Sequence, residues 1–241
     1  SRMQATRPDV LKGIRASYAL GGCGQGFCGR YRHLHAAARV VTQIDEFWSH
    51  SWHTSPLMKF MTLWLLKCGP PAIMVGTLAA LLAYLLISLG VLPHVPLSLG
   101  VQSPWCLLFG ELGFLWALIL WRPGSTVFLD VACINQEDGG SKAHGLASMG
   151  AFLKASRSLL VLWDPTYINR LWCVFELAAF LGSRTEPRLD VWPTVLGTLL
   201  LVGELGMFAL FQVLGFVVDT HNLVALPLTA GLLVLVCFSC L

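Results

Sequence analysis

GTLAALLAYLLISLG, residues 76–90, is an uncharged stretch inside a longer apolar run that extends from Ala72 to Leu92. A bilayer core about 30 Å thick needs roughly 20 apolar residues in a helix, because no water is present there to satisfy free backbone groups. The chain as a whole is 56% hydrophobic and 12% charged, with a mean hydropathy of +0.69. A soluble domain of this length would carry about twice as many charges. We therefore expect an integral membrane protein.

Three further apolar stretches predict a total of four membrane spans, grouped as two hairpins. The second span, Trp105–Trp121, has tryptophans at both ends, where an interfacial aromatic belt would lie. A polar turn separates the third span, Val195–Val218, from the fourth, Leu223–Leu241. A buried core helix is the alternative for each stretch taken singly, above all for the last one, because Pro227 interrupts it.

The basic residues predict the orientation of these spans. No lysine or arginine lies between Pro93 and Pro104 or beyond Val218, so all 16 would lie on one side of the bilayer. The positive-inside rule makes that side cytosolic. The four predicted spans make the protein multi-pass. The net charge of +3 is concentrated before the first span, where it favours anionic lipid headgroups. No basic run with interleaved aromatic residues is present, so we expect a lipid bilayer as partner and no nucleic acid.

The cysteines predict neither disulfides nor a metal site. The eight cysteines are scattered, and Cys106, Cys237 and Cys240 fall in or beside apolar stretches. Cys23, Cys28, His33 and His35 can be drawn as a ligand set, but their spacing matches no common zinc module. A Gly-rich segment is the simpler interpretation, and no metal is expected.

Outside the apolar stretches, strand-like and helix-like segments alternate. Strands are expected for IDEFWSHSW from Ile44, for STVFLDVACI (125–134), for SLLVLW (158–163) and for residues 188–192. Helical spacing follows the second and third strands, at 143–156 and 170–181, and an amphipathic helix is expected over 55–67. Strands that alternate with helices imply a parallel α/β sheet.

The order of these segments predicts a domain that is split by a membrane hairpin. Residues 1–43 mix Gly, Arg and His without a sustained period, apart from a short helix over 32–41, and form a poorly determined lead-in. The split domain comprises 44–70 and 122–192, the first hairpin 71–121 and the second hairpin 193–241. The insertion needs an even number of spans, because the strands on either side of it must share one sheet.

Two motifs resemble known families. WCVFEL at 172–177 is similar to the motif of plant-type Toll/interleukin-receptor (TIR) domains: tryptophan, cysteine, an aliphatic residue, any residue, glutamate and leucine. Asp130 with Cys133–Glu137 resembles the fungal heterokaryon-incompatibility (HET) domains, which are TIR relatives with an aspartate followed by CINQ and an acid. The resemblance implies a small parallel-sheet, flavodoxin-like TIR domain. The chain departs from that pattern in its two hairpins, the second of which replaces the family's last strand and helices.

The resemblance also implies a chemistry. In TIR domains that cleave NAD, the glutamate of this motif is catalytic, and the matching residue is Glu176. NAD would be the substrate, and no separate cofactor is expected. A carboxylate beside the ribose holds its hydroxyls and stabilises the positive charge that develops as nicotinamide leaves. Parallel sheets bind ligands beyond the carboxyl ends of their strands. The substrate-binding residues expected there are Ser49, His50, Ser51, Trp52, Asp130, Asn135, Gln136 and Trp172.

Other interpretations stay open at this point. Glu176 near Arg170 would form an exposed ion pair, and Trp172 with Phe175 would be core packing, in a non-catalytic scaffold that signals or self-associates through the TIR-like domain. Glu111 and Glu204 each lie in the tetrapeptide GELG inside a predicted span, where an acid is costly unless it is neutral or paired. These acids would either pack in protonated form or serve a small channel or transporter.

Overall fold

The computed structural model describes residues 10–24, 27, 32–93, 104–135 and 139–218. Contacts divide the chain into two units. The first unit consists of residues 1–64 and 122–197, and the second of residues 65–121 and 198–241. Each unit is described by itself below.

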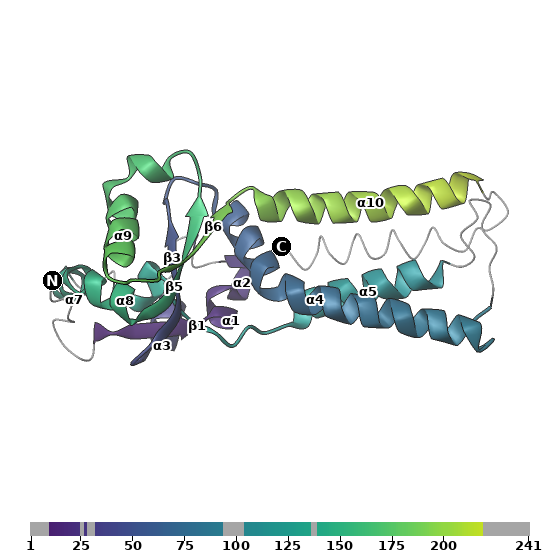
Figure 1. The fold of residues 1–241 in the computed structure, drawn as a ribbon, viewed down its shortest axis with the longest axis horizontal. Coiled ribbons are helices and arrows are strands. Elements are labelled where there is room, and N and C mark those ends of the chain that lie inside the picture. The colour runs from purple at the N-terminus through teal and green to yellow at the C-terminus, as the bar shows by residue number, and fades with distance from the viewer. Residues whose placement is uncertain (1–9, 25–26, 28–31, 94–103, 136–138, 219–241) are drawn as a thin grey trace. The chain divides into compact units, whose positions relative to one another are not determined.

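The first unit is an α/β domain in which helices surround a central sheet (Figure 1). The sheet is mixed and six-stranded, in the order β2-β1-β4-β3-β5-β6. Strands β4, β3, β5 and β6 are parallel, in agreement with the expected parallel α/β core. The two strands from the lead-in are antiparallel. The strands are β1 (Lys12–Arg15), β2 (Arg39–Val40), β3 (Ile44–His50), β4 (Thr126–Phe128), β5 (Ser156–Trp163) and β6 (Arg188–Pro193).

Strand β3 lies between β4 and β5, so the segments on either side of the apolar insertion share one sheet. Glu46 pairs with Val127 on one side, and Ile44 pairs with Ser156 on the other. The rings of Phe47 and Phe128 stack with their centroids 4.5 Å apart. Strand β5 is buried over residues 159–162, which explains its continuous apolar run there, whereas β3 also buries the polar side chains of Ser49 and His50.

The predicted strand over 125–134 is wrong in its second half. β4 ends at Phe128, and Asp130–Cys133 forms the short helix α6. The Asp130 side chain accepts a hydrogen bond of 2.8 Å from the Val131 nitrogen. Aspartate commonly forms such local bonds to the backbone, which compete with the hydrogen bonds between strands. The apolar residues of α6 remain buried, so the apolar run alone could not distinguish a buried strand from a short buried helix.

The lead-in contains more structure than the sequence indicated. β1 pairs with β4 through Ile14 and Val127, and it also pairs with β2. Ile14 is 1% exposed and belongs to the core. A four-residue strand carries little periodicity of its own, so its position depends on a partner more than a hundred residues away. The lead-in helices are α1 (Ala16–Ala19), α2 (Gly21–Gly24) and α3 (Arg32–Ala37).

Helices lie on both faces of the sheet. α8 (Met149–Ala155) and α9 (Leu171–Gly182) lie on one side, and α1, α2 and the first turns of α4 lie on the other (Figure 1). α8 and α9 both contact β3, and they also contact each other. The segment predicted as one helix over 143–156 is divided into α7 (Gly139–Ala147) and α8. The hydrophobic core lies between these layers.

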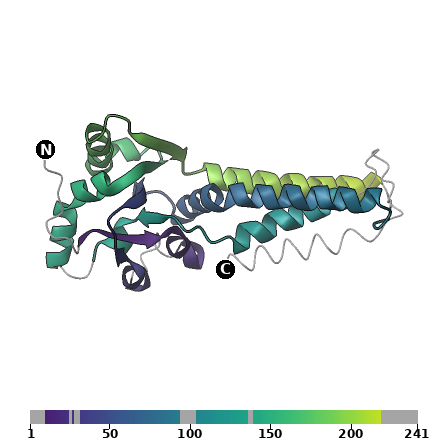
Figure 2. The same cartoon turned by 60° about the horizontal axis from the view of Figure 1, so that its bottom comes forward.

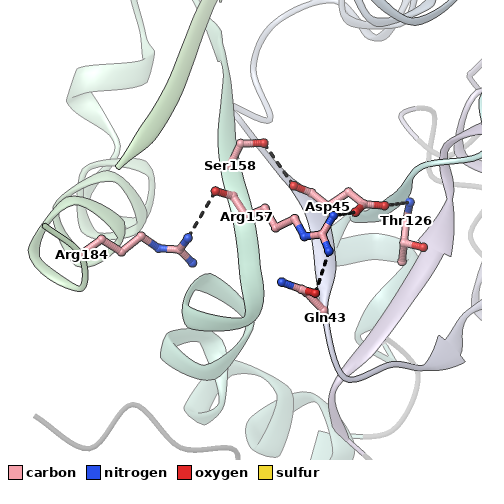
Figure 3. Close-up of polar contacts among 6 residues, drawn as sticks. All are labelled: Gln43, Asp45, Thr126, Arg157, Ser158 and Arg184. Atoms are coloured by element: carbon pink, nitrogen blue, oxygen red, sulfur yellow. Dashed lines mark hydrogen bonds and ion pairs between the residues drawn. The ribbon is translucent and has the colours of Figure 1, made fainter. Parts of the chain in front are cut away.

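A polar cluster joins three strands at their amino-terminal ends (Figure 3). The Asp45 carboxylate of β3 accepts a hydrogen bond of 2.8 Å from the Thr126 nitrogen of β4. Arg157 of β5 lies 3.4 Å from the same carboxylate and donates to Gln43 at 2.9 Å. Because the side chains of Arg157 and Asp45 are 60% and 40% exposed, this ion pair contributes little to stability and mainly marks the register of the strands.

The second unit contains close packing between two helices. Most of α4 (Pro56–Ser88) lies in this unit, and it runs beside α5 (Trp105–Leu120) in both views (Figures 1 and 2). A Cβ atom at Gly76 would lie 2.8 Å from the Gly110 carbonyl oxygen, and one at Gly113 would lie 2.9 Å from the Ala79 side chain. Glycine is therefore required where these helices cross.

Within the described residues, α4 is the one helix long and apolar enough to cross a bilayer, by length and composition. It has 33 residues, and its most apolar part has a mean hydropathy of 2.0. The amphipathic helix and the first span, expected as separate segments, form one continuous helix that includes Pro70 and Pro71. α5 has 16 residues, and α10 is Leu196–Val218. The expected fourth span, 223–241, lies outside the described residues.

Candidate functional site

A cavity of about 410 Å³ opens at the carboxyl ends of the central parallel strands. Three chain segments line it: the end of β3 with its following loop, the β4–α6 junction, and the segment from η3 (Tyr167–Asn169) into α9. This is the place where open α/β sheets bind ligands. The lining residues are Phe47, Trp48, His50, Trp52, Phe128, Asp130, Asn169, Arg170, Leu171, Trp172, Cys173 and Glu176.

Glu176 is the buried carboxyl group of this cavity. Helix α9 begins after Arg170, whose backbone is extended, and it buries a stripe formed by Cys173, Glu176 and Phe180. Glu176 is 5% exposed, which excludes the exposed ion pair with Arg170. Burial raises the pKa of Glu176 to about 8, and Asp130 adds to the rise. The carboxyl group is therefore mostly protonated at neutral pH.

Two hydroxyl groups lie behind this carboxyl group. The Ser49 Oγ of β3 lies 2.5 Å from Glu176 Oε2 and 2.7 Å from the Tyr167 hydroxyl oxygen. Contact with Ser49 and with the Trp172 indole lowers the pKa of Glu176, although burial outweighs both. Ser49 was predicted to bind substrate directly, but it is 1% exposed and is not among the lining residues. Tyr167 was not among the predicted site residues.

His50 forms part of the cavity wall as a largely buried imidazole. Its ring lies edge-on to Phe27, with the centroids 5.5 Å apart, and 5.7 Å from the Trp52 ring. Burial lowers the pKa of His50, and Asp130 opposes that shift only in part. The imidazole is neutral at neutral pH, so it offers a ligand one hydrogen-bond donor and one acceptor.

Two tryptophans line the cavity and remain accessible. Trp52 is 51% exposed and Trp172 is 42% exposed, so neither is a core residue. The Trp172 ring contacts Phe175, which is also exposed, with the ring centroids 5.6 Å apart. These indole faces are suited to stacking on a planar ring of a ligand.

Asp164 connects the loops beside the cavity. Its carboxylate accepts hydrogen bonds from Thr54 Oγ1 at 2.5 Å and from the Thr166 nitrogen at 2.7 Å. Burial alone would raise the pKa of Asp164, but the hydrogen bonds from Thr166 and Thr54 lower it. Ser51, predicted to bind substrate, instead contacts Thr166 through their hydroxyl oxygens at 2.9 Å. Asp164 thus joins the loop after β3 to the loop after β5.

The remaining predicted site residues lie elsewhere. Asn135 is described but is not among the lining residues, and Gln136 lies outside the described residues. Of the predicted set, His50, Trp52, Asp130, Trp172 and Glu176 therefore line one cavity. Arg170 also lines it and was not predicted as a ligand-binding residue; its position two residues before the WCVFEL motif was the available signal.

Neither Cys173, which lines the cavity, nor Cys133 in α6 is suited to nucleophilic chemistry. Burial raises the pKa of Cys133 and of Cys173 to about 12, so both remain thiols at neutral pH. A thiolate is the nucleophilic form of cysteine. Among the residues that the structure describes, no group of three or more His, Cys, Asp or Glu side chains could hold a metal ion.

The two acids of the GELG sequences differ in exposure. Glu111 of α5 is 7% exposed, and its Oε1 atom has no hydrogen-bond partner among the described residues. Glu204 of α10 is exposed within the second unit.

Searches against protein-family models, curated proteins and solved structures found no match to this chain.

Proposed function

We propose that the first unit is a TIR-like domain that hydrolyses NAD at the cytosolic face of a membrane. The observation that carries this proposal is the buried carboxyl group of Glu176 in the wall of a cavity that combines aromatic rings with a few polar side chains, among them Asp130 and Arg170. Small-molecule sites are typically mostly apolar cavities of this size with a few placed polar groups. The residue that the motif marks as catalytic is therefore the one that the fold buries beside a space for a ligand.

The proposed reaction breaks the bond between the anomeric carbon of the ribose and the nicotinamide nitrogen. The bonding electron pair stays on that nitrogen, so nicotinamide leaves as a neutral molecule. The oxygen of a water molecule bonds to the anomeric carbon and loses its proton to solvent. Positive charge develops on the ribose in the transition state, where the Glu176 carboxylate stabilises it and holds the ribose hydroxyls. The neutral leaving group requires no second acid.

Because the pKa of Glu176 is raised, binding of the substrate would change the protonation state of this residue. The nicotinamide ring of NAD carries a positive charge, and a cation close to a carboxyl group favours its ionised form. NAD binding would therefore release a proton from Glu176 and produce the carboxylate that the reaction needs. Trp52 and Trp172 would stack on the planar rings of the substrate.

The enzymatic proposal is tested by nicotinamide release from NAD with the full chain in detergent micelles. Wild type should release nicotinamide, and Glu176→Gln should release at least about a hundredfold less, the usual scale for a group that stabilises transition-state charge. Glu186→Gln, an exposed glutamate between α9 and β6, is the matched control and should behave as wild type. Equal release by wild type and Glu176→Gln, or none by either, would refute the proposal.

The membrane part of the proposal is supported by the surfaces of the second unit. The exposed side of α4 carries large apolar residues such as Ile73, Leu78 and Leu81, where a helix in water would be polar. Small residues at the α4–α5 crossing allow the close backbone approach common between membrane helices. We propose that these helices form the first membrane hairpin and that α10 begins a second.

The topology can be tested with trypsin, because no Lys or Arg occurs in residues 72–121 or 193–241. Trypsin should cut the chain in inside-out vesicles and leave it intact when added from the opposite side. The chain should also stay with the membrane during extraction at alkaline pH. Cutting from both sides, or release at alkaline pH, would contradict the multi-pass cytosolic arrangement.

A non-catalytic, self-associating scaffold is the second candidate, because α9 exposes an apolar surface. Leu171 is 86% exposed and Phe175 is 45% exposed, and Glu176 is the sole charged residue in this helix. Exposed apolar surfaces of this kind mark interaction sites. This candidate predicts cross-linked oligomers that Phe175→Glu abolishes and Val40→Glu, an equally polar change on exposed β2, leaves intact. Monomers throughout would exclude it.

A further inference from the structure

Three buried side chains from three different elements lie in one hydrogen-bonded chain behind the cavity. Ser49 of β3 is 1% exposed, Tyr167 of η3 is 2% exposed and Glu176 of α9 is 5% exposed. The Ser49 Oγ lies 2.5 Å from Glu176 Oε2 and 2.7 Å from the Tyr167 hydroxyl oxygen. The Tyr167 hydroxyl in turn lies 3.4 Å from the Cys173 carbonyl oxygen. The chain of contacts thus starts at the carboxyl group and ends on the backbone of α9.

The number of available protons restricts how these contacts can be made. Ser49 and Tyr167 each have a single hydroxyl proton, and the Cys173 carbonyl oxygen can only accept. When Glu176 is ionised, Ser49 must donate to the carboxylate. The 2.7 Å contact between the two hydroxyl oxygens then needs the Tyr167 proton, so Tyr167 donates to Ser49 and not to Cys173.

The opposite direction of the chain becomes available when Glu176 is protonated on Oε2. The carboxyl group then donates to Ser49, Ser49 donates to Tyr167, and Tyr167 donates to the Cys173 carbonyl oxygen. All three contacts carry a proton in this state. Both protonation states of Glu176 are therefore hydrogen-bonded in the same atomic positions, and only hydroxyl rotation separates them.

We propose that Ser49 and Tyr167 are positioning residues that hold the Glu176 carboxyl group in one place in both protonation states by reversing the direction of their hydrogen bonds. A buried carboxyl group with a partner in one state alone would move or lose a hydrogen bond when it titrates, at a cost comparable to an unsatisfied buried group. The value of this device for catalysis rests on the proposed function. The reversal itself is a property of the protein without substrate.

Several charged or titratable groups surround Glu176 and bear on its titration. His50 on β3 is neutral near pH 7, and Asp130 on α6 raises the pKa of Glu176. On α9, Cys173 remains a thiol below about pH 12, and Arg170 lines the same cavity. Burial raises the pKa of Tyr167 above its usual value, so its own ionisation does not interfere between pH 5 and the midpoint of Glu176.

The reversal predicts that the Tyr167 hydroxyl reports the charge of Glu176 through Ser49. The chain has four tyrosines, so labelling tyrosine with carbon-13 at Cζ gives few resonances, and Tyr167→Phe identifies the relevant one. In the full chain in micelles, the Tyr167 resonance should shift with a midpoint of about 8, as Glu176 titrates. The Tyr18 resonance, from an exposed ring, serves as the internal control and should lack the transition that Glu176 produces.

The Ser49→Ala variant decides between the hydrogen-bonded chain and a simple electrostatic effect. Ser49→Ala should abolish the shift of Tyr167, because the connection is lost. Glu176→Gln should abolish it as well, because the titrating charge is removed, and a shift that persists in this isosteric variant would also overturn the proposal. A flat Tyr167 resonance in wild type, or a shift that persists in Ser49→Ala, would overturn the proposal. The expected titration in a protein that releases no nicotinamide would refute the proposed function and leave the reversal intact.

Discussion

The Gly197 nitrogen donates a hydrogen bond of 3.0 Å to Thr62 Oγ1, and the same hydroxyl donates to the Thr194 carbonyl oxygen at 2.7 Å. Both contacts lie in the first unit, at the start of α10 and in the second turn of α4. A Cβ atom at Gly197 would lie 2.3 Å from the Thr62 nitrogen, so only glycine fits there. The beginnings of two apolar helices are thereby joined within the polar domain.

Substitution of Gly197 by alanine should separate these helix starts. The added methyl group would meet the backbone of α4, which cannot yield as a flexible side chain can, and the Thr62 hydrogen bond would lengthen or break. We expect a loss of about 1–3 kcal/mol in the free energy of unfolding, measured by denaturant titration in micelles. Gly203→Ala, on the same helix with nothing within 4 Å, is the matched control. Equal stability of the two variants would contradict this contact.

The stability of the first unit should decrease as the pH rises from about 5 to 8. Glu176 has a raised pKa of about 8 in the folded protein, so in this range the folded state binds more protons than the unfolded state. The protonated carboxyl group thus stabilises the folded protein fully below the pKa that Glu176 has in the unfolded chain. This stabilisation is lost as the pH rises to the pKa that Glu176 has in the folded protein. Glu176→Gln should remove this slope, with a difference on the order of a few kcal/mol at pH 8. If wild type and Glu176→Gln instead gave parallel pH profiles in thermal unfolding, the pKa of Glu176 would not be raised and the prediction would be wrong.

The rate of nicotinamide release at low NAD concentration should rise with pH and level off above about 8. The proposed mechanism needs the carboxylate, and the free protein binds a proton at Glu176 with a pKa of about 8. Below that value, kcat/KM should fall about tenfold per pH unit, because it is proportional to the ionised fraction. The residual activity of Glu176→Gln should lack this dependence. A maximum below pH 6 in the wild-type profile would exclude a catalytic carboxylate with this pKa.

Replacement of Glu111 by leucine should stabilise the second unit. The Glu111 Oε1 atom is buried without a hydrogen-bond partner among the described residues, and such an atom typically costs about 1–3 kcal/mol. Thermal unfolding in micelles should therefore occur at a higher temperature, whereas Leu112→Met, at the exposed neighbouring position, should change little.

Liposomes that contain wild type should show no proton flux. Flux that Glu111→Leu abolishes would instead favour the channel or transporter interpretation.

The sequence predicted several features that depend on short stretches of chain. The apolar run around Leu81, the strands at Ile44 and Ser158, and the helix that carries Glu176 all produce local patterns of apolar residues, and the structure places an element at each. β1 around Ile14 escaped prediction because a four-residue strand has almost no periodicity.

The site was predictable in outline and not in detail. The rule that ligands bind beyond the carboxyl ends of parallel strands placed His50, Trp52 and Asp130 together with Glu176, and all four line the cavity. The same rule could not distinguish Ser49, which lies behind the carboxyl group, from His50, which faces the cavity. Neighbouring residues of a strand point to opposite sides, and the sequence does not state which side faces a ligand.

The sequence by itself determined the apolar helices, the alternation of strands with helices and the candidate glutamate, because these follow from neighbouring residues and from one compact motif. The tertiary structure alone decided that Glu176 is buried, that its pKa is raised and that Ser49 and Tyr167 support it. The physical reason is distance along the chain: Ser49 contacts residues 118 and 127 positions away, and only the folded sheet brings them within a hydrogen bond.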